Sequence, residues 1–445
     1  MTKRCAPNAN IVHFIGIGGI GMSALARYFL STRGESSRTK GWSVSGSDLS
    51  PSSITDELEK EGARIHIGKH SANNVPREVN LVIYNQAILS DNIELQTARK
   101  LTIVCQSYPE AIGKLTHHYK TIAIAGAHGK STTTAMTALI LIKAGLDPTV
   151  IVGTKLKELG NKNFRRGGGP YLVLEADEWK GSFWHYSPFI GAITNIDKEH
   201  LDFYKNFSNV KKAFARFKKQ CQHVVTHSTD PKVKTAIKKI LKVPGEHNLK
   251  NALLAYSIGR KLNIPRSTIL RTLSKYTGAW RRMEFRGYLQ FPTSHILHLT
   301  SNFKVFDDYA HHPTEIRATL AGFRQKWPQN PLICVFQAHQ LERLKLLYND
   351  FKTAFKEANK VIILPTYTVA GRENSAKRGQ PKASSTIGNL SKKLAHDIGA
   401  EYLENPKRLK MFLADQLFAS RYPLSPIVIM MGAGDIVRYT NLLIK

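Results

Sequence analysis

The stretch TIAIAGAHGKSTTTAMTALILIKAG, residues 121–145, decides the fold of the chain's central part. An apolar, β-branched segment is followed by small residues, a lysine, four hydroxyl-bearing residues and a run typical of a helix. Small residues let backbone N–H groups approach phosphate oxygens, and the positive end of the following helix points at them. The segment therefore predicts a strand, a nucleotide-phosphate loop and a helix. The loop residues are Gly126, Ala127, His128, Gly129, Lys130, Ser131 and Thr132.

This loop departs from the standard P-loop spacing, because residue 124 is Ile where that pattern has glycine. The alternative interpretation is a helix N-terminus rich in Ser and Thr caps. As a nucleotide loop, it would place Lys130 on the β- and γ-phosphates and Ser131 on Mg²⁺.

Two later segments, YLVLEADE (171–178) and TNIDKEHLD (194–202), could complete a metal site. The first should form a strand beside the loop strand, so Glu175 is expected to hold Mg²⁺. His200 follows the next strand and, beside Glu175 and Ser131, could complete a second metal site. The alternatives are a helix cap for the carboxylate and a structural role for the histidine.

A different glycine turn, FIGIGGIG at residues 14–21, stands near the N-terminus. Its glycines fit the G-x-G-x-x-G pattern that binds a pyrophosphate, and Asp48 closes the next strand, where a ribose-binding acid is expected. NAD is the usual ligand, so a NAD-dependent oxidoreductase is one hypothesis. A chain with its own ATP loop needs no hydride carrier, however, and a nucleotide-sugar diphosphate would bind the same glycines. The residues concerned are Gly16, Gly18, Gly19, Gly21 and Asp48.

Length and composition set further bounds. At 445 residues the chain should hold about two to four domains. Its four cysteines form no CxxC pair, which fits a reducing compartment and a cytoplasmic protein. The glycine-rich run at residues 11–26 is too short to cross a membrane.

The formal net charge of +31 favours anionic partners. Residues 205–242 hold eleven Lys or Arg and a single acid, Asp230. Lysines at helical spacing are more typical of a solvated helix face, and few aromatic residues are interleaved for base stacking. Nucleic acid is therefore not the expected partner, although a nucleic-acid-binding ATPase stays an alternative.

Strands alternating with helices predict three α/β domains, at residues 1–115, 116–285 and 286–445. The first should be a parallel sheet covered on both faces. The third should have its polar strand ends at a ligand site. Arg281 and Arg282 at the second junction could clamp a transferring phosphoryl group. The polar segment 371–385 is expected to be a mobile loop.

In order along the chain, the motifs GIGGIGMSALA, GAHGKSTTTAM, LEADE, TNIDKEHLD, EHNLKNALLA, WRRMEF, DDYAHHPTEI and MGAGD resemble the Mur ligases. Within that family they are most similar to the member that acts on UDP-N-acetylmuramate and L-alanine. The resemblance implies a UDP-binding Rossmann-like domain, a central ATP-binding domain and a C-terminal Rossmann-like domain.

The implied reaction is ATP-dependent amide formation in peptidoglycan precursor synthesis. The carboxylate of UDP-N-acetylmuramate becomes an acyl phosphate, and the amine of L-alanine displaces phosphate. Mg²⁺, or Mn²⁺, is the implied cofactor, and a monomer or homodimer is expected. Ligation of a recycled tripeptide to the same sugar nucleotide is the alternative within the family.

Carried over residue by residue, the resemblance adds roles to those above. It implies adenine-side contacts from His247, Asn248 and Asn251, a γ-phosphate contact from Arg282, and a nucleotide contact from Asp308. It implies that His311, His312 and Arg343 lie on the amino-acid side.

The chain departs from the family pattern at several places: Ala127 stands where threonine is usual, Ser131 replaces threonine, and HQLER (339–343) keeps only Arg343 of two arginines. The amino acid is therefore open among alanine, glycine and serine. The sequence gives no signal for a carbamylated lysine.

Overall fold

In the computed structural model, residues 10–32, 41–289, 303–367, 384–419 and 424–444 are described. They form two compact units. The first comprises residues up to Ile240 together with Lys250–Tyr276, and the second comprises Leu241–Leu249 together with residues from Thr277 onward. The predicted loop at 371–385 falls almost wholly outside the described residues.

The N-terminal sheet of the first unit is entirely parallel, with strand order β3-β2-β1-β4-β5. Local signals set its helices: a capping box between Ser52 and Thr55 begins α2, and Asn92 caps α3. Its elements are β1 (Asn10–Ile15), α1 (Ile20–Ser31), β2 (Trp42–Asp48), α2 (Ser53–Lys60), β3 (Arg64–Ile67), η1 (Ala72–Asn74), β4 (Leu81–Tyr84), α3 (Ile93–Lys100), β5 (Val104–Ser107) and α4 (Tyr108–Thr116).

The central sheet has the order β11-β10-β6-β9-β7-β8, parallel except for β8, which runs antiparallel to β7. The nucleotide-loop strand β6 lies in its middle, and α5 is buried over most of its length. The elements are β6 (Lys120–Ala125), α5 (Lys130–Lys143), β7 (Thr149–Leu156), η2 (Lys157–Leu159), β8 (Lys162–Arg165), β9 (Tyr171–Ala176), η3 (Trp179–His185), β10 (Ile190–Ile193), α6 (Leu201–Tyr204), α7 (Phe207–Gln220), β11 (His223–Val225), α8 (Pro231–Ile240), α9 (Glu246–Lys261) and α10 (Arg266–Leu273).

One continuous apolar core joins these two sheets. It runs from Phe14 and Leu25 of the N-terminal sheet and α1 to Phe164 and Leu174 of the central sheet. Polar contacts reinforce the junction, because Arg27 on α1 donates to Glu57, Glu61 and Asn163. The glycine turn and the nucleotide loop therefore belong to the same packed body.

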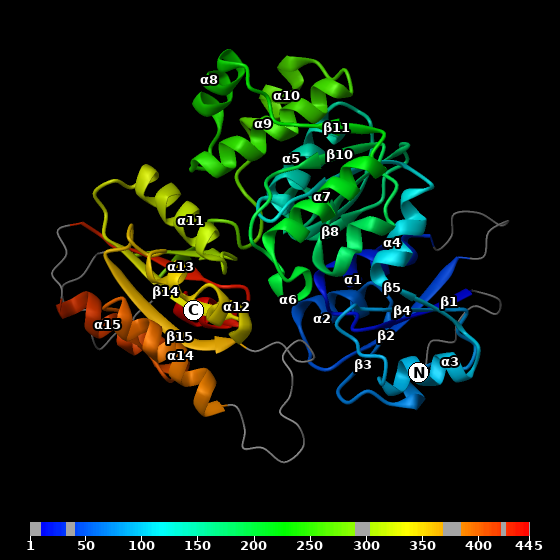
Figure 1. The fold of residues 1–445 in the computed structure, drawn as a ribbon, viewed down its shortest axis with the longest axis horizontal. Helices are drawn as coiled ribbons and strands as arrows, with labels where there is room; N and C mark the ends of the chain where they lie inside the picture. The colour runs from blue at the N-terminus through cyan, green and yellow to red at the C-terminus, as the bar shows by residue number, and fades with distance from the viewer. Residues whose placement is uncertain (1–9, 33–40, 290–302, 368–383, 420–423, 445) are drawn as a thin grey trace. The chain divides into compact units, whose positions relative to one another are not determined.

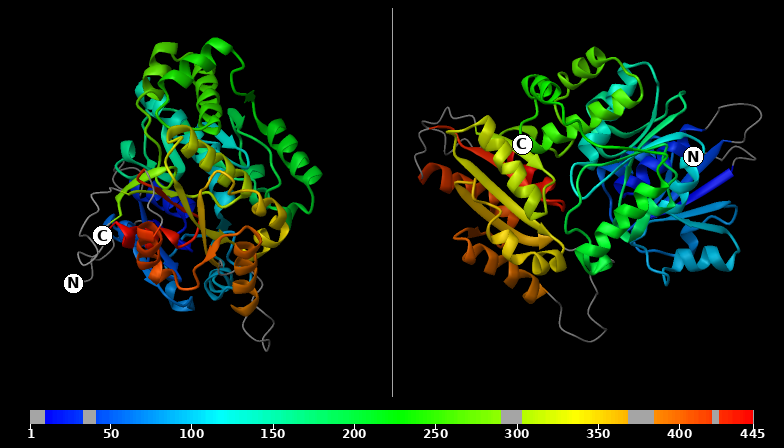
Figure 2. Two further views of the ribbon diagram at one scale, coloured as in Figure 1. Left: turned by 90° about the vertical axis from the view of Figure 1, so that its left-hand side faces the viewer. Right: turned by 45° about the horizontal axis from the view of Figure 1, so that its top comes forward.

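The second unit holds a six-stranded sheet of order β12-β13-β17-β14-β15-β16, in which only β12 is antiparallel. Alternate residues of β14 face two separate cores: Cys334 packs with α11 and α14, whereas Val335 packs with α15 and α16. Helices thus cover both faces (Figures 1 and 2). The elements are β12 (Glu284–Tyr288), β13 (Lys304–Asp308), α11 (Pro313–Lys326), β14 (Leu332–His339), α12 (Leu341–Leu346), α13 (Tyr348–Lys352), β15 (Lys360–Tyr367), α14 (Ser384–Asp397), β16 (Glu401–Tyr402), η5 (Pro406–Arg408), α15 (Leu409–Ala419), β17 (Ile427–Met431) and α16 (Ile436–Leu443).

The predicted three-part α/β architecture is confirmed, whereas the boundaries at 115/116 and 285/286 stay predictions. Two details differ from expectation. The strand expected at 102–105 begins at Val104, because Thr102 has a φ of 54° that turns the chain before it. The β7–β8 hairpin was not predicted at all.

Candidate active site

The segment predicted to be a nucleotide loop lies between β6 and α5. Gly129, which precedes α5, has a φ of 82°, and a Cβ there would collide with the Asn251 amide. Asn195, at the end of the neighbouring strand β10, holds the loop by accepting from His128 N (3.1 Å) and donating to His128 O (2.8 Å). These two hydrogen bonds hold the loop in place. No side chain caps the first turn of α5.

Lys130 projects from the start of α5 into a cluster of acids. Its Nζ donates to Gly126 O at 2.6 Å and to Glu178 Oε2 at 2.8 Å, and it lies 3.8 Å from Asp177. Burial opposes the charged ammonium, but Glu178 and Asp177 outweigh it and raise the pKa of Lys130 above its usual range. Lys130 is therefore a fixed cation beside the loop.

Glu175 and Ser131 meet as predicted. Strand β9 pairs with β6, which places Glu175 opposite Ile124, and Ser131 Oγ donates to Glu175 Oε2 at 3.1 Å. The Gly153 N–H donates to the other oxygen at 2.5 Å. A Cβ at Gly153 would come within 2.7 Å of the carboxylate, so only glycine allows this approach.

His200 lies with a different acid from the one the sequence suggested. Its Nε2 is 3.9 Å from Glu178 Oε1, and one ligand atom from each of Asp177, Glu178 and His200 lies within 4.8 Å of the other two. Sequence reasoning weighed Glu175 alone in LEADE and missed Glu178. The carboxylate oxygens of this set suit Mg²⁺ or Mn²⁺, whereas the imidazole is more typical of metals such as Zn²⁺.

The N-terminal glycine turn is shaped for close backbone approach. Gly18 N donates to Asp48 Oδ2 at 2.9 Å, and a Cβ at Gly18 would lie 2.8 Å from that oxygen. Gly16 has a φ of 80°, and a Cβ at Gly21 would lie 2.9 Å from the Tyr108 ring. The predicted glycines and Asp48 thus form one turn, to which the structure adds Tyr108.

In the second unit, Asp308 ends β13 and accepts backbone N–H bonds from Met283 (2.7 Å) and Ala310 (2.9 Å). Burial raises its pKa to about 6, although Arg282 opposes the shift. The Arg282 guanidinium lies over the Tyr309 ring at 5.1 Å. Arg281 instead is buried and donates to Asp307 and Gly432 O, so its guanidinium is committed within the fold.

The two histidines after β13 are held by α11. His311 Nδ1 lies 3.3 Å from Glu315, and His312 accepts from Thr314 N as the N-cap of α11. The His311 ring lies 5.6 Å from the His339 ring, at the end of β14. Arg343 lies on α12, immediately after that strand.

The predicted adenine-side residues lie on α9. His247 packs against Gly245, and Asn248 donates to Pro244 O at 2.7 Å. Burial, aided by the Arg282 charge, lowers the pKa of His247 to about 4, so the ring is neutral near pH 7.

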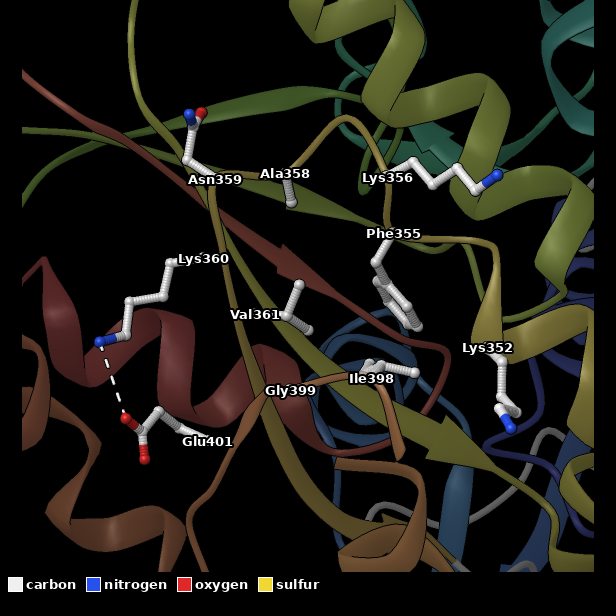
Figure 3. A pocket seen from close by; sticks show the side chains of 10 residues that line it. All are labelled: Lys352, Phe355, Lys356, Ala358, Asn359, Lys360, Val361, Ile398, Gly399 and Glu401. Atoms are coloured by element: carbon white, nitrogen blue, oxygen red, sulfur yellow. Dashed lines mark ion pairs between the residues drawn. The ribbon is translucent and has the colours of Figure 1, made fainter. Parts of the chain in front are cut away.

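A cavity of about 470 Å³ lies elsewhere in the second unit, at the starts of β15 and β16 (Figure 3). Lys352, Phe355, Lys360 and Glu401 are among its lining residues. Asp308 is the last residue of β13 and Gln340 follows β14, so both lie at the carboxyl ends of the strands, whereas this cavity lies at the amino ends and is not part of the predicted site. No helix within the described residues is long and apolar enough to span a membrane.

Comparison with known proteins agrees with this geometry. Three family models match: "Mur ligase family, catalytic domain" at residues 11–120, "Mur ligase middle domain" at 124–242, and "Mur ligase, glutamate ligase domain" at 294–401. The chain belongs to the Mur ligase family and is an ATP-dependent ligase.

Its curated relatives include UDP-N-acetylmuramate–L-alanine ligases. That of Aquifex aeolicus is 33% identical, with 97% of each chain covered, and that of Clostridium botulinum is 36% identical over 81% of this chain and 84% of the relative. The solved UDP-N-acetylmuramate-alanine ligase of Thermotoga maritima is 27% identical, with a TM-score of 0.74 and 97% of each chain covered. A murein peptide ligase from Psychrobacter arcticus shares the fold, at 20% identity and a TM-score of 0.66.

Proposed function

We propose that the chain is the ligase that joins L-alanine to the carboxylate of UDP-N-acetylmuramate with conversion of ATP to ADP and phosphate. The observation that carries the proposal is the presence, in one packed unit, of two glycine turns of the kind that binds phosphate, with the Ser131–Glu175 contact at the second. The near full-length likeness to ligases of that name supports the choice of substrates. The likenesses do not favour an oxidoreductase or the tripeptide ligase.

In this mechanism, the glycine turn at 16–21 binds the UDP diphosphate, and the loop at 126–132 binds ATP. Lys130 binds the β- and γ-phosphates and stabilises charge as the γ-phosphoryl group moves to the muramate carboxylate. Ser131 and Glu175 would hold one Mg²⁺ and His200 a second. When bound, these ions neutralise the negative charge that separates the two reactants.

The likeness to the family assigns the remaining contacts. Arg282 and Asp308 are assigned to the nucleotide, as are His247, Asn248 and Asn251 on the adenine side. His311, His312 and Arg343 are assigned to the amino acid, whose amine attacks the acyl phosphate and releases phosphate. The enzyme's contribution is chiefly positioning and electrostatic stabilisation. We assign this reaction to the cytoplasm, where ATP is available.

The test is phosphate release with UDP-N-acetylmuramate, ATP and Mg²⁺, comparing L-alanine, glycine, L-serine and the recycled tripeptide. The proposal expects release that depends on L-alanine. Release only with the tripeptide would replace the proposal with the recycling activity, and release with no amino-acid dependence would reject both.

A further inference from the structure

Glu178 is a buried acid for which the proposed reaction has no use. Its side chain is 1% exposed, and one of its oxygens, Oε2, accepts a hydrogen bond from Lys130 Nζ at 2.8 Å. Among the described residues, no donor reaches its other oxygen, Oε1, within hydrogen-bonding distance. A buried carboxylate oxygen without a partner is costly, so one expects a ligand for it.

Glu178 Oε1 faces a second group that can bind a cation. The His200 Nε2 atom lies 3.9 Å from it, and the Asp177 carboxylate completes a set of three within 4.8 Å. A small divalent cation sits about 2.1 Å from each ligand, so two ligands across it lie about 4.2 Å apart at most. The Glu178–His200 separation already falls within that span.

The backbone holds these groups in place before any ligand arrives. The Tyr204 hydroxyl, on α6, donates to the Glu178 carbonyl at 2.5 Å, which ties α6 to the start of η3. His200 precedes α6 with a φ of 55°, and Lys180 follows Glu178 with a φ of 49°. Such left-handed backbone outside glycine costs free energy and persists where the surroundings impose it.

We propose that Glu178, with Asp177 and His200, binds a divalent cation, and that Lys130 occupies Glu178 when the cation and nucleotide are absent. The inference deepens the proposed function, on which it rests for the identity of the nucleotide. Phosphates that draw Lys130 away release Glu178 Oε2, so nucleotide and cation binding favour each other. Glu178 then takes the place beside His200 that the sequence analysis gave to Glu175 and Ser131.

The experiment measures Mn²⁺ binding to the full chain by electron paramagnetic resonance, without ATP or sugar nucleotide. Glu178→Gln keeps the shape of the side chain and should weaken Mn²⁺ binding at the His200 site at least tenfold. Glu158→Gln, an exposed acid of the same unit, should leave it unchanged. Unchanged affinity in a folded Glu178→Gln protein would overturn the proposal.

A double-mutant cycle separates the proposed sharing from simple charge repulsion. Lys130→Met should tighten Mn²⁺ binding several-fold in the parent chain and have no such effect in Glu178→Gln. Equal tightening in both backgrounds would mean that Lys130 acts only through its charge, and would overturn the coupling. If Glu178→Gln does not fold, His200→Gln must weaken Mn²⁺ binding, and an unchanged affinity there overturns the site.

These measurements are independent of the overall reaction. The amino-acid dependence of phosphate release decides the proposed function on the unaltered chain. Mn²⁺ binding without substrates decides the role of Glu178, so either can fail while the other stands.

Discussion

We expect the N-terminal sheet to lose stability at acidic pH because of the buried acid Glu94. Its carboxylate is 0% exposed and accepts from Ser47 Oγ (2.6 Å), Asn74 Nδ2 (2.7 Å) and His70 Nδ1 (3.0 Å), with His13 Nε2 at 3.5 Å. Burial alone would raise its pKa, but these hydrogen bonds outweigh burial and lower the pKa from 4.5 to about 2. The network therefore stabilises the ionised form.

The direction in which the free energy of unfolding changes with pH follows from proton binding. The unfolded chain, with the higher pKa, binds more protons between pH 2 and 4.5, so the free energy of unfolding rises with pH in that range. At about 1.4 kcal/mol per pH unit, the difference corresponds to roughly 3 kcal/mol. This contribution is fully present above pH 4.5 and is lost as the pH falls to about 2.

Glu94→Gln should therefore destabilise the N-terminal sheet by about 3 kcal/mol at neutral pH and by much less near pH 2. The assay is equilibrium urea unfolding from pH 2 to 7, read by hydrogen exchange of peptides covering β1 and α3. Glu59→Gln, an exposed acid on α2, is the matched control and should show no such trend. A difference between wild type and Glu94→Gln that stays constant across this range would refute the reasoning.

Three further changes have defined outcomes. Lys130→Ala should abolish phosphate release while calorimetry still detects UDP-N-acetylmuramate binding, and loss of both would contradict two separate phosphate turns. His247, with a pKa lowered to about 4, adds stability that is complete above its ordinary value of 6.5 and is lost as pH falls toward 4. His247→Gln should therefore flatten the change in melting temperature between pH 4 and 6.5, and an unaltered profile would count against the assignment. Gly129→Ala should weaken binding of a fluorescent ATP analogue at least tenfold, because the added Cβ would meet the Asn251 amide. Gly145→Ala is the control: Gly145 has a φ of 76°, but no atom lies within 4 Å of an added Cβ, so this change should lower stability alone. Equal analogue affinity in the two variants would disprove the steric explanation.

Local signals predicted the parts of the fold that depend on neighbouring residues. The strand, small-residue loop and helix at 121–145 follow from apolar patterning and glycine positions. The contact between Glu175 and Ser131 could be predicted from the sequence, because strands that alternate with helices lie side by side in a parallel sheet. The β7–β8 hairpin was not predicted, because a turn at Gly160 and Asn161 interrupts the expected strand–helix alternation.

The features that the sequence did not predict depend on contacts between residues far apart in the chain. Glu178 meets Lys130 across 48 positions, and the left-handed turn at Lys180 and Gly181 that follows Glu178 has no clear sequence signature. The same holds for Arg281, whose burial against Asp307 depends on strands β12 and β13 meeting. The roles of the predicted site residues stay predictions.

The uninterrupted apolar core between the first two sheets has a consequence for how the reactants meet. With Phe14 and Leu174 packed into one core, the two glycine turns cannot hinge apart without exposing apolar surface to water. Under the proposed function, their fixed separation sets the length that a bound sugar nucleotide must have. The proposal then expects that a shortened or lengthened analogue binds through its diphosphate but does not bring its carboxylate to the γ-phosphate.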